Sequence, residues 1–352
     1  MSRIVHICVP EKFIPPFIRF VGEHFNIREH SFLLGGRKSK QASHPLPREQ
    51  FIPYHGYINK LKNLRRLYSA EKIILHGLYE SQSLYLLALQ PWLLKKCHWI
   101  IWGADLHQFE EKRTKLKPRF KEWVRARVIR RLGHIVTYIP GDHELARKWY
   151  STNAAFHECL CYESNTVTTR KLSVRKSQRL TIQVGNSAYP RNNHCDAIDR
   201  IAPFATADIQ VFAPLSYGPK DEAQRVAAYG KARLGDKFTA VVDFLPLEKY
   251  LEQLDSVDIG IFNQNHQQAM GNMITLLGMG KTLYLRRKTS CWDMFERLGI
   301  KIFDMEHFNL ELLTENDRCR NMEIMADCFS RQRLVVQYEA IFGTYSRRSS
   351  VA

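Results

Sequence analysis

The sequence lacks any long hydrophobic run. No stretch reaches the roughly 18 consecutive apolar residues that a membrane-spanning helix needs. The closest candidate, "SLYLLALQPWLLKK", is interrupted by Pro91, Lys95 and Lys96. The apolar stretch near the N-terminus is too short for a signal peptide, and no small-residue cleavage site follows it. We therefore expect no spanning helix, and we interpret the first residues as an ordinary strand.

The spacing of common metal and nucleotide motifs is also missing. The eight cysteines are scattered singly apart from Cys159 and Cys161, and no CxxC or paired cysteine and histidine pattern suggests zinc. The absence of GxxxxGK(S/T) counts against a P-loop NTPase. We expect free thiols in a reducing cytoplasm, with neither a metal nor a cofactor.

Positive charge is what the sequence has in excess. It holds 52 lysines and arginines against 35 aspartates and glutamates, a net charge of +17. This balance indicates an anionic partner, which could be nucleic acid, an acidic membrane surface or a phosphate-bearing substrate. At 352 residues the chain fits two domains of ordinary size.

Apolar runs typical of strands alternate with helical stretches along the chain. In the second half the expected strands are "TIQV", "DIQVFAPL", "FTAVVDFL", "VDIGIF", "TLYL" and "IKIF". In the first half they are "RIVHICV", "HSFLLG", "KIILHG", "HWIIWG" and "HIVTYI". This alternation predicts parallel sheets covered by helices on both faces.

We therefore predict an α/β fold with two Rossmann-like domains facing a cleft, the GT-B architecture of glycosyltransferases. The expected domains are residues 1–165 and 180–330, joined by the polar, basic segment 165–179. Residues 331–352 are expected to form a C-terminal helix, packing back toward the first domain, and a loose tail. Helicases and periplasmic binding proteins can also be two-lobed, but the missing P-loop and signal peptide count against them.

The residues that follow each strand are the candidate site, because ligands bind beyond the carboxyl ends of parallel strands. In the second half these loops are rich in amides and hydroxyls, which suit a sugar. The helix that Gly271 opens can hold a phosphate at its start, and Tyr217 can stack on a base. A plain turn or a solvated loop is the alternative interpretation. The residues concerned are the turn glycine Gly185 and the polar residues Asn186, Ser187, Asn263, Gln264, Asn265, Gln267, Gln268 and Asn272.

Ionisable residues follow two strands of the first half. "HWIIWGADLH" ends a strand just before Asp105, and "IILHGLYESQS" does the same with His76 and Glu80. A carboxylate at the end of a central strand is where a general base would stand, and we favour Asp105 for that role. The alternative is that these residues are satisfied core or capping groups.

Residues 112–131 hold ten lysines and arginines against one glutamate. A basic helix that carries tryptophan and phenylalanine is a candidate for contact with an anionic membrane. A charged outer face on an otherwise packed helix is the alternative. The residues we predict to touch the membrane are Arg119, Lys121, Trp123 and Arg125.

The motifs above resemble a known family. "LHG", "IWGADL", "VGNS", "PLSYGP", "QQAMGN" and "CWDMFERLGI" follow in the same order as in bacterial TDP-N-acetylfucosamine:lipid II N-acetylfucosaminyltransferases, also called 4-alpha-L-fucosyltransferases. His6, Arg191, Asn193 and His194 add to the likeness, which runs over nearly the whole chain. Gly-Asn-Met at 271–273 departs from the glycine-rich turn of some members.

The resemblance implies a peripheral enzyme on the cytoplasmic face of the bacterial inner membrane. It would transfer 4-acetamido-4,6-dideoxygalactose from a TDP donor to an undecaprenyl-diphosphate-linked saccharide, in enterobacterial common antigen synthesis or for O-antigen or another surface glycan. His76 and Asp105 would then lie on the acceptor side. The donor-site candidates would be Gly185, Asn186, Ser187, Tyr217, Gln267, Gln268, Gly271 and Asn272, to which the amide-rich loop itself adds Asn263.

GT-B enzymes usually stabilise the departing diphosphate without a metal, and no DxD motif is present here. An inverting reaction needs a base, for which Asp105 is the candidate, whereas a retaining reaction does not; the sequence leaves the stereochemistry open. A nucleic-acid-binding protein would suit the charge, but the uncharged loops of the second half favour a sugar. A sugar-nucleotide sensor without turnover is a further alternative.

Overall fold

The computed structural model describes residues 3–9, 11–35, 51–54, 56–111, 113–167 and 179–343. The chain divides into two compact units, the first formed by Met1–Ser164 with Arg331–Ala352 and the second by Asn165–Ser330. Most of the expected linker 165–179 and the tail after residue 343 lie outside the described residues.

The first unit is built on a parallel sheet of seven strands in the order β3-β2-β1-β4-β5-β6-β7. Five of these strands match those expected from the sequence. The other two, β3 and β7, have three residues each, too few for a hydrophobic pattern to reveal. The strands are β1 (Ile4–Cys8), β2 (His30–Leu34), β3 (Phe51–Pro53), β4 (Lys72–His76), β5 (Cys97–Ile100), β6 (His134–Val136) and β7 (Ala155–His157).

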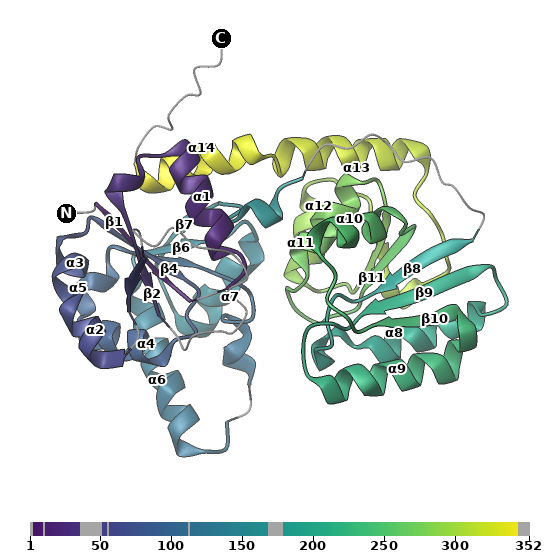
Figure 1. Ribbon diagram of the computed structural model, residues 1–352, viewed down its shortest axis with the longest axis horizontal. Helices are drawn as coiled ribbons and strands as arrows, with labels where there is room; N and C mark the ends of the chain where they lie inside the picture. Colours follow the sequence, from purple (N-terminus) through teal and green to yellow (C-terminus); the bar gives the residue numbers. More distant parts are fainter. Residues whose placement is uncertain are drawn as a thin grey trace, which may run out of the picture. The chain divides into compact units, whose positions relative to one another are not determined.

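Helices cover both faces of this sheet because its strands carry buried side chains on both sides (Figure 1). Trp99 and Ile135 lie in the core on one face, where the chain contributes α3 (Leu64–Ser69), α4 (Ser81–Ala88), α5 (Pro91–Leu94), α6 (Leu116–Arg131) and α7 (Pro140–Tyr150). The short α2 (Gly56–Lys62) precedes α3.

The other face is covered by α1 (Ile14–His24) and by the C-terminal helix α14 (Arg331–Phe342). The rings of Phe17 in α1 and Tyr338 in α14 lie 5.3 Å apart. The backbone nitrogen of Leu160 donates to Gln337 Oε1 of α14 at 2.8 Å. The prediction that the C-terminal helix packs back on the first domain is therefore confirmed.

The second unit has a parallel sheet of six strands in the order β10-β9-β8-β11-β12-β13. The strands are β8 (Leu180–Val184), β9 (Ile209–Pro214), β10 (Phe238–Val241), β11 (Ile259–Phe262), β12 (Thr282–Leu285) and β13 (Phe303–Asp304). The helices are α8 (His194–Ile201), α9 (Lys220–Leu234), α10 (Leu247–Asp255), α11 (Met270–Gly278), α12 (Ser290–Arg297) and α13 (Glu315–Cys328). Figure 1 shows α8 and α9 on one face and α10, α11 and α12 on the other.

Both sheets have the doubly wound Rossmann order, in which the strand sequence reverses direction once. The reversal falls between β1 and β4 in the first unit and between β8 and β11 in the second. Ligands of such sheets bind at the carboxyl ends of the strands on either side of that point. In the described residues, no helix is both long and apolar enough to cross a membrane.

Candidate active site

The loop that leaves β8 turns at Gly185. The backbone nitrogen of this residue donates to Ile261 O of β11 at 2.8 Å, so the turn begins at the switch point of the second sheet. Gly185 has a φ of +65°, and a Cβ atom built on it would lie 2.7 Å from His194 Nε2. The backbone conformation and the adjacent imidazole ring both require glycine here.

Amide and hydroxyl groups from two loops converge next to this turn. Gln268 Nε2 lies 3.3 Å from Ser187 Oγ and 3.5 Å from Asn186 Oδ1. Asn192 Nδ2 donates to Ser187 Oγ at 3.1 Å and to Ser187 O at 3.0 Å, which holds the hydroxyl in place. Residues far apart in the sequence are thus brought together as the sequence predicts.

Asn263, the residue after β11, is buried and forms hydrogen bonds at the same edge of the sheet. Its Nδ2 donates to Asp196 Oδ2 at 2.7 Å, and its Oδ1 accepts from Arg286 Nε at 3.1 Å. Arg286 Nη2 also lies 3.0 Å from Asp196 Oδ2. Partial burial opposes ionisation of Asp196, but the Asn263 hydrogen bond and the nearby Arg200 and Arg286 lower its pKa overall.

Arg286, in the post-strand stretch "RRKTS", and Asp196 were not predicted as site residues from the sequence. Arg286 follows β12, so the rule that pointed to the other post-strand loops applies to it as well. The Asp196 carboxylate pairs with both Arg286 and Arg200. One carboxylate balances only one of these two arginines, so the group around Asn263 carries one net positive charge.

Several buried polar atoms of this cluster have no hydrogen-bond partner within the described part of the chain. They are Asn192 Oδ1, both ring nitrogens of His194, Gln264 Oε1 and Gln267 Oε1. Burial lowers the pKa of His194 to about 4, so the ring is neutral at pH 7. Because buried polar groups are normally paired, these atoms indicate a site completed by water or by a ligand.

Helix α11 begins directly after the amide-rich loop. Ala269, its N-cap, has a φ of +62°, and Gln264 Nε2 donates to Gln268 O at 2.8 Å, so the loop is held by its own side chains. Gly271 and Asn272 lie in the first turn of the helix. Asn272 lies against Tyr250, whose pKa burial raises to about 12. A helix start of this kind attracts anions.

Tyr217, after β9, is 40% exposed, and its ring lies edge-to-face with Phe244 at 6.1 Å. Its carbonyl accepts from Ala188 N at 2.5 Å, which ties the β9 loop to the β8 loop. The ring is therefore anchored next to the amide cluster while keeping a face open to solvent.

Asp105 is not an accessible base in the first unit. The side chain is fully buried, and its two oxygens accept four hydrogen bonds at 2.8–3.1 Å. The donors are Trp99 Nε1 and the backbone nitrogens of Leu78, Trp102 and Leu106. A carboxylate enclosed in this way cannot reach an acceptor hydroxyl, so our prediction of a base at Asp105 is wrong, and the residue instead holds two loops together.

His76 ends β4 as expected, but both of its ring nitrogens are engaged in the interior. Its Nε2 lies 3.1 Å from His6 Nδ1, and its Nδ1 lies 2.8 Å from the Tyr162 hydroxyl. The chain continues from His6 Nε2 to His30 Nδ1 at 2.9 Å. Burial lowers the pKa of His76 to about 3. The prediction that His76 acts at the site is therefore wrong, because the ring is neutral and enclosed.

Glu80 is the better-exposed carboxylate at this edge. Its Oε2 lies 2.7 Å from Lys60 Nζ and also contacts Ser83. The same oxygen would lie 3.1 Å from a Cβ atom on Gly35, whose backbone nitrogen donates to Cys8 O at the end of β1. Glu80 therefore lies at the switch point of the first sheet, with its side chain 16% exposed.

Helix α6 divides its basic residues between interior and surface. Arg125 is fully buried, donating to Leu78 O at 2.8 Å and to the carbonyl of Asp105. The predicted membrane contact at Arg125 is wrong for that reason. Arg119 is exposed, Lys121 is half-buried and Trp123 is 51% exposed with Arg127 stacked on its ring at 4.2 Å.

The exposed side of α6 forms one wall of an apolar groove of about 390 Å³. Tyr85 and Leu89, near α4, line the opposite wall. Arg127 and Arg131 add positive charge to the lining.

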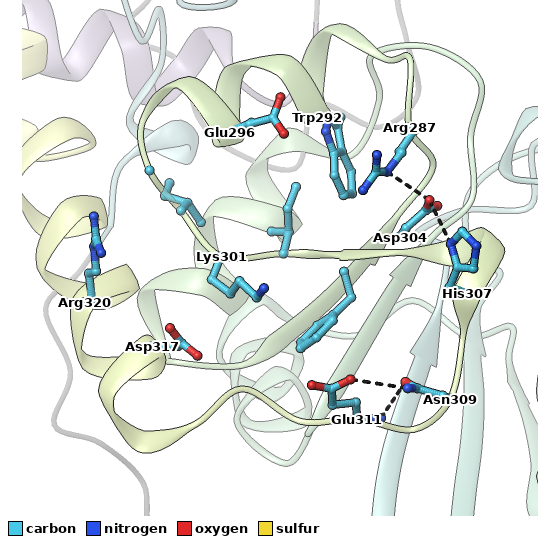
Figure 2. Close-up of a pocket in the computed structure, with 14 residues that line it drawn as sticks. Arg287, Trp292, Glu296, Lys301, Asp304, His307, Asn309, Glu311, Asp317 and Arg320 are labelled. Carbon is cyan, nitrogen blue, oxygen red and sulfur yellow. Dashed lines mark hydrogen bonds and ion pairs between the residues drawn. The ribbon is translucent and has the colours of Figure 1, made fainter.

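A second cavity, of about 570 Å³, lies at the open edge of the second sheet (Figure 2). Its lining is strongly charged, and Arg287 pairs there with Asp304 at 3.0 Å while its guanidinium lies 5.0 Å from the Trp292 ring. The predicted donor residues do not line this cavity. The two consecutive arginines therefore have different partners. Arg286 bonds to Asn263 beside the amide cluster, whereas Arg287 pairs with Asp304 at the edge of the sheet.

Known structures share this architecture over nearly the whole chain. The crystal structure of Anabaena HepE in complex with UDP and glucose matches with a TM-score of 0.65 and 10% identity, covering 97% of this chain and 98% of that one. A glycosyltransferase from Rickettsia africae matches with a TM-score of 0.65 and 12% identity, covering 97% of each chain. WaaG, a glycosyltransferase involved in lipopolysaccharide biosynthesis, matches at 0.61 and 11%, covering 96% and 98%.

These likenesses confirm the GT-B fold expected from the sequence. Residues 41–326 also match the family described as 4-alpha-L-fucosyltransferase, glycosyl transferase group 56, which agrees with the resemblance of the motifs. The chain is therefore a glycosyltransferase and belongs to the 4-alpha-L-fucosyltransferase family.

Proposed function

We propose that the enzyme moves a 4-acetamido-4,6-dideoxyhexose of the N-acetylfucosamine type from a TDP-sugar to an undecaprenyl-diphosphate-linked saccharide. The product would serve a cell-surface polysaccharide of the enterobacterial common antigen type. The observation that carries this proposal is the neutral amide cluster of Asn186, Ser187, Asn192 and Gln268 at the switch point of a sheet whose chain belongs to a fucosyltransferase family.

The donor is assigned to the second unit. Side-chain amides can both donate and accept, so they match sugar hydroxyls and an acetamido group without adding charge. The unpartnered oxygens of Gln264 and Gln267 are acceptors for such hydroxyls. The start of α11, with Gly271 and Asn272, is the binding place we assign to the diphosphate.

The thymine base is assigned to Tyr217. Its ring is 40% exposed, and the hydrogen bond between its carbonyl and Ala188 N holds this loop beside the amide cluster, so we assign the ring to stacking on the base. The complexes of HepE with UDP and with UDP-glucose support a nucleoside diphosphate sugar as the class of donor. The choice of TDP over UDP rests on the resemblance to the family.

The acceptor and the membrane are assigned to the first unit. The exposed Arg119 and Trp123 and the half-buried Lys121 of α6 form the surface we assign to anionic lipid on the cytoplasmic side of the inner membrane. A lipid-linked O-antigen or another surface glycan intermediate is the alternative acceptor, since the same features would serve it.

The acceptor hydroxyl would lose its proton to Glu80 if the reaction inverts the anomeric centre. Glu80 has the accessible position that Asp105 and His76 lack. If the reaction retains the configuration, no base is needed, and Glu80 orients the acceptor.

Incubation of the enzyme with TDP-4-acetamido-4,6-dideoxygalactose and a short-chain undecaprenyl-diphosphate disaccharide analogue tests the proposal. Mass spectrometry of the lipid fraction should show one added acetamido-dideoxyhexose. Transfer to a lipid-linked O-antigen intermediate but not to this disaccharide would support the alternative acceptor. No transfer to any lipid-linked acceptor would contradict the proposal.

A further inference from the structure

Three histidines of the first unit gather on one face of its sheet. His98 of β5 and His134 of β6 are directly paired Cα partners, and His157 of β7 is two residues beyond Ala155, the partner of His134. Residues that are opposite each other, or two apart along a strand, share a face. One ring nitrogen of each histidine lies within 4.8 Å of one ring nitrogen of each of the others.

The hydrogen bonds of the three histidines fix part of their protonation pattern. His98 Nδ1 lies 3.2 Å from Lys96 O, and only an N–H can bond to a carbonyl, so His98 keeps its lone pair on Nε2. A histidine that donates one N–H to a backbone carbonyl is the usual arrangement for a metal ligand. His134 Nδ1 lies 2.9 Å from His157 Nε2, and one of the two carries the shared proton.

A metal ion could replace that shared proton once the rings reorient to bring their nitrogens, now within 4.8 Å of one another, closer together. Two nitrogens that bind one Zn²⁺ in tetrahedral geometry are about 3.3 Å apart, given bonds of about 2.0–2.1 Å. The His134–His157 pair would open by about 0.4 Å. The rings of His98 and His134 are stacked at 4.0 Å and would have to tilt toward each other. His134 and His157 are only half-buried, which leaves room for this movement.

We propose that His98, His134 and His157 form a binding site for a transition-metal ion, with Zn²⁺ as the best match. Three imidazole nitrogens suit Zn²⁺ and exclude Mg²⁺ and Ca²⁺, which take oxygen ligands. The fourth position would be held by water. The site lies on the face of the first sheet that α1 and α14 cover (Figure 1), and it shares no residue with the sugar-nucleotide site assigned to the second unit.

The spacing of the sequence could not reveal this site. Each histidine comes from a different strand, and only the strand order β5-β6-β7 makes them neighbours. The three histidines belong to the first unit, whereas the amide cluster belongs to the second.

Isothermal titration of the EDTA-treated full-length chain with ZnCl₂, followed by Co²⁺ absorption spectroscopy, tests the proposal. Wild type should bind one Zn²⁺ and give the intense visible bands of four-coordinate Co²⁺. Loss of a supporting group beyond the ligands already costs metal sites about 10–100-fold, so His157→Gln and His134→Gln should each weaken binding by about 100-fold or more.

His143→Gln is the matched control, because His143 is a half-buried histidine of the same unit that bonds to Ala154 O at 3.3 Å outside the cluster. Its affinity should equal that of wild type. Circular dichroism of each variant would verify folding. Absence of stoichiometric binding in wild type, or equal affinity in His157→Gln, would overturn the proposal and leave a hydrogen-bonded histidine stack. TDP binding, measured in the same samples, tests the function separately.

Discussion

Lys60 Nζ lies 2.7 Å from Glu80 Oε2, and the Lys60 side chain is fully buried while that of Glu80 is 16% exposed. The ammonium group also donates to Tyr54 O at 2.9 Å and to Ser83 Oγ at 3.0 Å. Burial lowers the pKa of Lys60, and the Glu80 carboxylate opposes that shift. The pair therefore fixes a carboxylate at the carboxyl edge of the first sheet.

Glu80→Gln should lower kcat for sugar transfer by at least about 100-fold if Glu80 is the base, because general base catalysis commonly supplies factors of that size. Gln keeps a hydrogen-bond acceptor for Lys60, so the variant should fold. The affinity for TDP should stay within about twofold, since the donor is assigned to the other unit. Near-normal kcat, measured with a lipid-linked acceptor, would remove Glu80 from the chemistry.

Asp105→Asn should destabilise the protein instead of acting on chemistry alone. One carboxylate oxygen would become an NH₂ group that faces two donors at about 3 Å, and each unsatisfied buried group costs about 1–3 kcal/mol. Urea unfolding should show a loss of about 2–4 kcal/mol. Asp243→Asn, at an exposed aspartate, is the control and should change stability little. Wild-type stability together with lost turnover would restore Asp105 as a catalytic candidate.

The free energy of unfolding should decrease as the pH decreases, because of the buried histidine chain His30–His6–His76. Burial lowers the pKa of His76 to about 3 and that of His30 to about 4, and it lowers the pKa of His6 well below its usual value. The unfolded chain binds protons on these rings below about pH 6.5, while the folded protein does not. The free energy of unfolding therefore has its full value above about pH 6.5 and decreases progressively as the pH is lowered toward 4.

Each such imidazole should remove about 2 kcal/mol between pH 7.5 and pH 5. Denaturant unfolding across this range measures the slope. His76→Gln should have a shallower slope than wild type, by about one proton, because one titrating ring is gone. A free energy of unfolding that stays constant from pH 7.5 to pH 5 would contradict the account of these histidines as neutral and enclosed.

Membrane binding should depend on the exposed apolar residues of α6. Leu116 is 81% exposed and Trp123 is 51% exposed. Burial of a large apolar side chain is worth about 1.5–3 kcal/mol, so Leu116→Ser with Trp123→Ser should weaken sedimentation with anionic vesicles by at least about tenfold. Charge reversal at Arg119 and Lys121 should weaken it further and make the remainder less salt-sensitive.

Val336→Ser on α14 is a matched control for this surface, because Val336 is 52% exposed and lies on a helix away from α6 in the sequence. Its binding to anionic vesicles should equal that of wild type. Equal sedimentation of the α6 variants and wild type would leave α6 with a purely structural role.

Much of the fold follows from local pattern. The strands of both sheets end in Gly-containing or polar loops, and their alternation with helices was enough to predict two doubly wound sheets. Strands β3 and β7 were not predicted, because three residues are too few to show the alternation of buried and exposed positions. The cluster of Asn186, Ser187 and Gln268 was also predictable, since each follows a strand that flanks the switch point.

Side-chain direction was the part that the sequence could not supply. Asp105 follows a strand in the expected way, but its loop folds inward and Trp99 Nε1 donates to it from the core. Arg125 looks like a surface cation in a basic run, yet it is drawn inside by the carbonyls of Leu78 and Asp105. Both outcomes depend on tertiary contacts between segments that are distant in the chain.

Calorimetric titration of the purified protein with TDP, UDP and GDP tests the central claim most directly. TDP should bind selectively to wild type. Gly185→Ala should abolish binding because its Cβ meets His194 at 2.7 Å, while Gly235→Ala, which also has positive φ but nothing within 4 Å, should lose some stability and keep TDP affinity. Failure of wild type to bind any nucleoside diphosphate, or undiminished binding by Gly185→Ala, would contradict a donor site at the β8 turn.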